Sequence, residues 1–188
     1  MQAFLISLST VAVAEIGDRT QLLSLMLAAR FRRPWPILAG VLCATLANHA
    51  AAGFIGQRLG HFLTPRILDC AVGISMIAMA LWTLKPDTLD EASAGGRSKG
   101  AFLATLVTFF VAEIGDKTQI ATVALAAAYS NLPAVVAGTT TGMLLANAPV
   151  VFFGKAFSAR LPLKAIRYLA SLLFMALGVY FLVRGSAT

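Results

Sequence analysis

The sequence predicts an all-α membrane protein with six transmembrane helices arranged as two inverted three-helix repeats. Three observations lead to this fold class. The chain is too apolar for a soluble domain, it divides into six apolar runs, and a seven-residue motif in its first half returns in its second half. Together they leave almost no chain outside the membrane.

Composition indicates an integral membrane protein in contact with the lipid bilayer. Of the 188 residues, 59% are hydrophobic and 12% are charged, with a mean hydropathy of +0.81, whereas soluble domains carry about 25% charged residues. A helix needs about 20 residues to cross about 30 Å of hydrocarbon, so six spans use nearly the whole chain. The formal charge of +7 does not indicate nucleic acid, because the basic residues lie in short loops between apolar runs.

Charged residues and prolines delimit the six predicted spans. The spans cover about residues 3–29, 35–57, 66–84, 100–128, 133–154 and 165–184. Residues 86–99 are small, polar and mixed in charge, which is typical of a linker. The predicted organisation is therefore a first repeat over 1–85, a cytoplasmic linker over 86–99 and a second repeat over 100–188.

The repeat is clearest in one motif. The sequence Glu-Ile-Gly-Asp-Arg-Thr-Gln, which starts at Glu15, recurs from Glu113 with lysine in place of arginine, an offset of 98 residues. Asn48 returns as Asn147 at an offset of 99. Because each half has three spans, the second half enters the membrane from the opposite face, which predicts an inverted repeat.

The distribution of lysine and arginine predicts the orientation. The loops after the first, third and fifth spans hold ten of them, against three on the other side. Cytoplasmic loops carry the excess of basic residues, so both termini are predicted to face away from the cytoplasm.

The motifs place six charged residues at bilayer depth. Each costs about 2.5–3.5 kcal/mol there, which indicates a function rather than chance. The predicted ligands of a metal ion at the midplane are the four carboxylates, Glu15, Asp18, Glu113 and Asp116. Further neutral oxygen donors within reach are Thr20, Thr118, Asn48 and Asn147. Such an all-oxygen site suits Ca²⁺, Mg²⁺ or Mn²⁺.

The charges of the motifs suggest how such a site works. With Arg19 and Lys117 as charge-balancing groups, the four carboxylates leave a net charge of minus two. One divalent cation or two protons balance that charge, which favours exchange of one for the other. The structural alternative is that each glutamate pairs with the basic residue four positions later on the same helix.

Several residues have two interpretations in the sequence alone. Gly17 and Gly115 either open the helix and free carbonyl groups, or let helices pack closely, as do the small residues over 138–142. His49, whose counterpart is Ala148, is either a proton relay or a hydrogen-bonded core histidine. Asp69, one turn into its span, is predicted to be an interfacial, solvated carboxylate.

The motifs do not indicate an enzyme. Intramembrane aspartyl proteases use Gly-x-Gly-Asp on one helix and Tyr-Asp on another. Here Glu15 and Glu113 take the first glycine position and no Tyr-Asp occurs. Neither a Ser-His pairing nor a phosphate-binding loop is present.

At these residues the chain resembles the Gdt-type cation/proton exchangers, once an uncharacterised protein family, whose hallmark is two copies of Glu-x-Gly-Asp-(Lys/Arg)-(Thr/Ser). Both copies match at every fixed position. The resemblance implies exchange of Mn²⁺ or Ca²⁺ for protons, mainly Mn²⁺ export in bacterial members, and an inner-membrane location. It implies that the four carboxylates form the ion site and that four side chains lie beside it, Thr20, Thr118, Gln21 and Gln119.

Two other functions remain open at this stage. The alternative transport function is export of small organic solutes such as amino acids, with Arg19 and Lys117 receiving a carboxylate. A non-transporting assembly factor is favoured only if alanine at Asp18 and Asp116 leaves function intact. Mn²⁺ and Ca²⁺ enter only as transported substrates, and no permanently bound cofactor is expected. Selectivity between the two ions depends on the size and rigidity of the site.

Overall fold

The computed structural model describes residues 1–85, 100–154 and 162–187, and within these ranges the chain is helical without strands. The predicted linker over 86–99, and Lys155 and Arg160 of the last loop, lie outside the described residues. The helices are α1 (Gln2–Glu15), α2 (Arg19–Phe31), α3 (Pro34–Phe62), α4 (Pro65–Thr83), α5 (Ala101–Glu113), α6 (Lys117–Ala128), α7 (Leu132–Phe153) and α9 (Leu163–Ala187).

Four of these helices, α3, α4, α7 and α9, are long and apolar enough to cross a membrane. The apolar helices α1 and α5 have 14 and 13 residues, which at about 1.5 Å per residue do not cross about 30 Å alone. The protein is therefore a multi-pass membrane protein. Six spans stay a prediction, in which α1 with α2 and α5 with α6 supply the other two.

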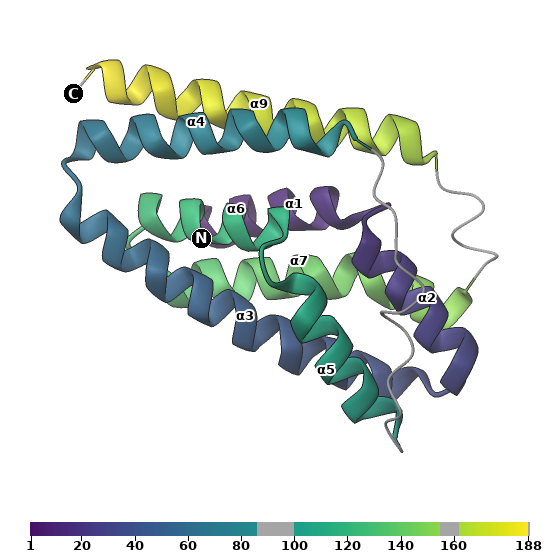
Figure 1. Ribbon diagram of the computed structural model, residues 1–188. Coiled ribbons are helices and arrows are strands. Elements are labelled where there is room, and N and C mark those ends of the chain that lie inside the picture. The colour runs from purple at the N-terminus through teal and green to yellow at the C-terminus, as the bar shows by residue number, and fades with distance from the viewer. Residues whose placement is uncertain (86–99, 155–161, 188) are drawn as a thin grey trace.

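Each of the predicted spans over 3–29 and 100–128 is divided into two helices, which agrees with the first of the two interpretations of Gly17 and Gly115. The chain leaves the helix after Glu15 and again after Glu113, and both bends are visible in Figure 1. Gly17 (φ 82°) and Gly115 (φ 74°) take the left-handed conformation that glycine adopts without a Cβ clash. A Cβ on Gly115 would meet nothing within 4 Å, so this glycine serves the bend and not close packing.

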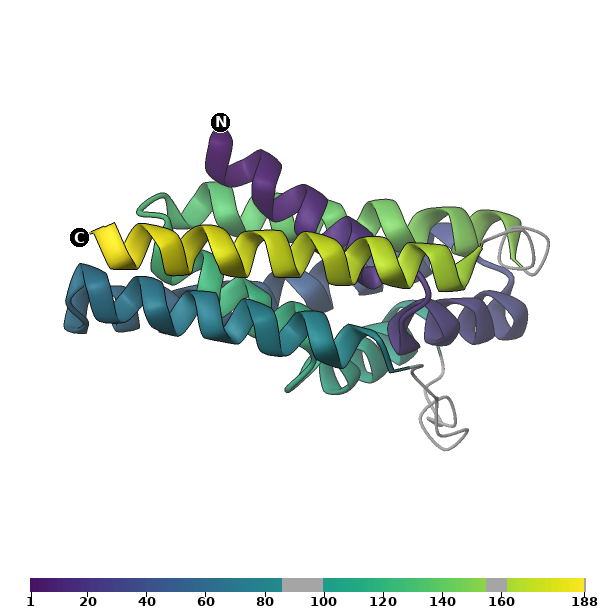
Figure 2. The same ribbon diagram turned by 90° about the horizontal axis from the view of Figure 1, so that it is seen from above.

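The two halves pack against each other through reciprocal pairs of helices. The helices α4 and α9 lie side by side and run in opposite directions (Figures 1 and 2). The first half's α1 packs on the second half's α7, and α5 packs on α3 in return. Each broken helix thus rests on a long helix of the other half.

Glycines allow these close contacts. A Cβ on Gly138 of α7 would lie 2.5 Å from the carbonyl oxygen of Phe4 in α1. A Cβ on Gly40 of α3 would lie 2.8 Å from the carbonyl oxygen of Phe102 in α5. The small residues over 138–142 therefore bring helices of this one chain together.

Apolar packing reaches the residue before each motif. One buried cluster, with Met76, Phe174 and Phe181 among its members, includes Ala14 just before the first motif. Ala112, just before the second motif, packs against the other cluster. The helices that lead into the two motifs are therefore anchored in the apolar core.

Asp69 is buried and not solvated, contrary to the prediction. Its carboxylate accepts a hydrogen bond of 2.8 Å from Nε of Arg184 and also contacts Nη2 of that residue. The antiparallel arrangement of α4 and α9 explains the pair, because it puts the last turns of α9 beside the first turns of α4.

Candidate cation site

Each motif aspartate caps the second half of a broken helix. Asp18 precedes α2 and accepts a hydrogen bond of 3.4 Å from the backbone N–H of Thr20, and Asp116 accepts one of 3.4 Å from Thr118 before α6. The two threonine hydroxyls donate to the same aspartates at 3.4 and 3.3 Å. Unpaired N–H groups and the helix dipole stabilise a carboxylate at this position.

The two motifs are joined by reciprocal ion pairs. Nη2 of Arg19 lies 2.9 Å from Oδ1 of Asp116, and Nζ of Lys117 lies 2.5 Å from Oδ1 of Asp18. Arg19 therefore pairs with an aspartate of the other half. The structural alternative required it to pair with Glu15 of its own motif, and the structure does not show that pair. The prediction that the two motifs meet holds for these aspartates and their basic partners.

The two glutamates end α1 and α5 and are fully buried. Oε1 of Glu15 accepts a hydrogen bond of 3.3 Å from the side-chain amide of Asn147. Oε2 of Glu113 accepts one of 3.3 Å from Thr118 and lies 3.7 Å from Nε2 of His49. The other oxygens, Oε2 of Glu15 and Oε1 of Glu113, have no hydrogen-bond partner among the residues that the structure describes. Within the described residues neither glutamate pairs with a lysine or arginine.

The carboxylates do not form one ready-made cluster. In the described part of the chain, no three His, Cys, Asp or Glu side chains are grouped so as to hold a metal ion. The aspartates are engaged with Arg19 and Lys117, and the glutamates accept hydrogen bonds from side chains of α7 and α6. Binding of one ion by all four carboxylates therefore requires side chains to move.

Gln21 and Gln119 stabilise the two bends. Oε1 of each accepts a hydrogen bond from the glycine N–H four residues earlier, at 2.8 Å from Gly17 and 2.7 Å from Gly115. Their amide groups donate to acceptors on α7 and α3. This role is not predicted from the sequence, although glutamine follows glycine by four residues in both motifs.

The two repeated asparagines have different surroundings. Asn147 lies beside Glu15, whereas Asn48 donates a hydrogen bond of 3.1 Å to a backbone carbonyl group of α5. His49, the next residue along α3, faces Glu113 instead. Glu15 therefore faces the amide of Asn147, whereas Glu113 faces the imidazole of His49.

A small polar recess lies beside one of the ion pairs. It measures about 10 Å³, which is room for about one water molecule, and is lined in part by Asp18, Lys117, Thr83 and Arg167. Oγ1 of Thr83 is buried without a hydrogen-bond partner. The recess lies where α4 ends and α9 begins.

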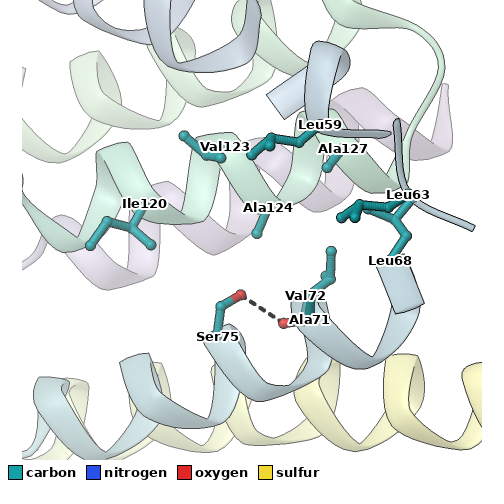
Figure 3. A pocket seen from close by; sticks show the side chains of 10 residues that line it. All are labelled: Leu59, Leu63, Leu68, Ala71, Val72, Ser75, Ile120, Val123, Ala124 and Ala127. Carbon is teal, nitrogen blue, oxygen red and sulfur yellow. Dashed lines mark hydrogen bonds between the residues drawn. The ribbon is translucent and has the colours of Figure 1, made fainter. Parts of the chain in front are cut away.

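The hollow between α3, α4 and α6 has a different character (Figure 3). It measures about 180 Å³ and is lined by leucine, valine, alanine and isoleucine side chains together with Ser75. The Ser75 hydroxyl donates a hydrogen bond of 2.8 Å to the Val72 carbonyl of its own helix. Ser75 is thus the one side chain with a polar atom among the described residues that line this hollow.

Known proteins identify the family. Residues 3–91 and 101–188 match the family described as divalent cation/proton antiporter GDT1. A Vibrio cholerae protein named as a candidate manganese exporter is 50% identical over 181 residues, which cover 95% of this chain and 90% of the relative. The GDT1-like protein sll0615 of Synechocystis is 30% identical, with 95% and 96% covered. The yeast divalent cation/proton antiporter GDT1 is 23% identical, with 100% and 86% covered.

No solved structure matches the chain. The family match covers both halves and includes both motifs, which confirms the resemblance and the prediction of a transporter instead of an enzyme. The chain belongs to the GDT1 family of divalent cation/proton antiporters.

Proposed function

We propose that this protein exports Mn²⁺, Ca²⁺ or both across the cell inner membrane in exchange for protons, with Glu15, Asp18, Glu113 and Asp116 as the ion site. One observation carries the proposal. Both aspartates are paired with a lysine or an arginine, whereas neither buried glutamate has such a partner among the described residues. The net charge of minus two therefore belongs to Glu15 and Glu113.

The two glutamate charges supply the exchange. Buried charge without a partner is costly, so both carboxylates must be neutralised together. One divalent cation carries the same charge as two protons, so either load neutralises the two carboxylates. A site that alternates between these two loads moves a cation one way and protons the other.

The proposed ligands are hard oxygen atoms, which suit Mn²⁺ and Ca²⁺. Thr20, Thr118 and Asn147 donate hydrogen bonds to the carboxylates, and Asn48 accepts one from Gln119. These four side chains are proposed as auxiliary ligands. Gln21 and Gln119 are proposed to keep the bends open beside them. The name of the Vibrio relative supports Mn²⁺ as the main substrate.

We also propose that the two halves are inverted repeats joined by a cytoplasmic linker. The antiparallel α4 and α9 and the exchanged contacts of α1 and α5 support this arrangement. The chain ends and the α3–α4 and α6–α7 turns lie toward one end of the bundle in both views. Three basic residues lie at the α2–α3 turn toward the other end, Arg30, Arg32 and Arg33, which supports placing that end in the cytoplasm.

Export of an amino acid or similar solute has less support. The basic groups that would receive its carboxylate, Arg19 and Lys117, are each engaged by an aspartate. A zwitterion would have to displace a charge-assisted hydrogen bond before it could bind.

Proton flux in proteoliposomes tests the proposal. Mn²⁺, Ca²⁺ and Mg²⁺ gradients are applied to wild type, to Asp116→Asn and to the control Asp69→Asn, which removes a buried charge outside the motifs. We expect Mn²⁺-driven proton flux in wild type and in the control, and none in Asp116→Asn. Folded wild-type protein that moves no divalent cation, or moves one without protons, overturns the proposal.

A further inference from the structure

His49 is a buried imidazole without a hydrogen-bond partner. It lies in the middle of α3 and is 0% exposed, and neither of its ring nitrogens has a hydrogen-bond partner in the described part of the chain. Leaving a buried polar group unpaired costs about 1–3 kcal/mol. The hydrogen-bonded core histidine considered from the sequence is therefore not what the structure shows, and the ring is available to a ligand.

The nearest charged group is one of the proposed ligands. Nε2 of His49 lies 3.7 Å from Oε2 of Glu113. Two atoms that bind one cation at about 2.1–2.6 Å lie no more than about 5 Å apart, so one ion can contact both. Oε1 of Glu113 and Oε2 of Glu15 are buried and also lack hydrogen-bond partners. The imidazole therefore lies against a carboxylate that has spare coordinating capacity.

The other half of the protein provides no such nitrogen. The position that matches His49 is Ala148, and the side chain at Glu15 is the amide of Asn147, whose nitrogen donates a hydrogen bond to the carboxylate. An amide nitrogen of this kind does not coordinate a metal, whereas a neutral imidazole nitrogen does. The potential ligand atoms near Glu15 are therefore oxygens, whereas those near Glu113 are oxygens and one imidazole nitrogen.

We infer that His49 is a ligand of the transported ion and makes the site prefer Mn²⁺ to Ca²⁺ and Mg²⁺. Ca²⁺ and Mg²⁺ take oxygen ligands, whereas imidazole is a common ligand of first-row transition metals. The inference rests on the proposed function, because it assigns the selectivity of that same site. The nitrogen ligand that we infer differs from the all-oxygen set of ligands that the sequence predicts.

Transport selectivity is the first test. Mn²⁺ and Ca²⁺ fluxes are compared in proteoliposomes of wild type, His49→Gln and His61→Gln. His61 is the other of the chain's two histidines and lies exposed near the end of the same helix, which makes it a matched control. We expect the Mn²⁺ to Ca²⁺ flux ratio to fall about tenfold in His49→Gln, on the scale of losing a group that tunes a metal site, and to stay unchanged in His61→Gln.

Spectroscopy of bound Mn²⁺ is the second test, and it needs only wild-type protein. Electron spin echo modulation of Mn²⁺ detects a coordinated imidazole nitrogen, and ¹⁵N-labelled histidine must change the pattern. We expect this coupling in wild type and in His61→Gln, and its loss in His49→Gln. Wild-type protein that binds Mn²⁺ without histidine coupling, or folded His49→Gln with an unchanged flux ratio, overturns the inference.

Failure of the proposed function has a different signature. Wild-type protein would then show no proton flux driven by any of the divalent cations. A histidine coupling to bound Mn²⁺ in that same protein would still support His49 as a ligand.

Discussion

The two copies of the motif have nearly the same local structure but different neighbours. The caps measure 3.4 Å at both aspartates, and the glycine–glutamine hydrogen bonds measure 2.8 and 2.7 Å. The glutamates differ, since Asn147 donates to Glu15 whereas Thr118 and His49 lie at Glu113. A repeated sequence thus repeats its bend, while side chains from other helices decide what each carboxylate contacts.

The two ion pairs differ in burial as well. The side chain of Lys117 is 3% exposed, whereas that of Arg19 is 34% exposed. The Asp18–Lys117 pair is therefore enclosed on both sides, and the Asp116–Arg19 pair is partly open. The two ion pairs therefore have similar chemical groups, but they are expected to contribute differently to the free energy of unfolding.

Removal of either glutamate charge should have the largest effect and tests whether the two copies are equal in function. We expect Glu15→Gln and Glu113→Gln each to abolish Mn²⁺-driven proton flux, because either change removes one of the two charges that a divalent cation neutralises. Proteoliposome flux measures the loss, and glutamine preserves the size of the side chain. If one of the two variants, shown to be folded, keeps its flux, the glutamates are not equivalent in transport.

Removal of the basic partners should separate the two ion pairs by stability. Lys117→Met leaves Asp18 buried beside an apolar group, and loss of one partner of a buried pair costs about 3–5 kcal/mol. Arg19→Met should cost less, because that pair is partly exposed. Thermal unfolding in detergent micelles measures both, with the double variant Asp18→Asn/Lys117→Met expected to recover most of the loss. Equal losses in the two single variants contradict the difference in burial.

The sequence predicts the long helices well, because apolar length alone determines them. The four spans over 35–57, 66–84, 133–154 and 165–184 all appear as single helices. The sequence does not decide whether the helices bend at Gly17 and Gly115, because a glycine in an apolar run suits either a bend or close helix packing. Aspartate is also a favoured helix N-cap residue, and its position directly after each glycine favours the bend.

The partners of the charged residues were harder to predict. Pairing of Glu15 with Arg19 assumes a continuous helix, and the bend at Gly17 removes that geometry. The observed pairs join residues about 98 positions apart, so they depend on how the two halves pack. The orientation of His49 toward Glu113 depends on the same packing.

Alanine at the bend glycines should show that the bends are equivalent in backbone cost. We expect Gly17→Ala and Gly115→Ala each to lower stability by about 1–2 kcal/mol, since both positions have positive φ. Gly100→Ala is the matched control, because its φ is −148° and a Cβ there meets nothing. Thermal unfolding of all three variants is the measurement. A loss at Gly100 as large as at Gly115 would show that positive φ is not the cause.

The glutamines should give the smallest effect, and one that differs between the copies. Gln21→Leu removes hydrogen bonds of 2.8 Å to the Gly17 N–H and 3.0 Å to the Ala146 carbonyl, and the side chain is buried. We expect a loss of about 1–1.5 kcal/mol in thermal unfolding. Gln119→Leu should cost about 0.5–1 kcal/mol, because its residue is less buried and its second hydrogen bond is 3.4 Å. If Gln119→Leu lost more stability than Gln21→Leu, the contact of Gln119 with Asn48 would contribute more to its bend than burial of Gln21 contributes to the other bend.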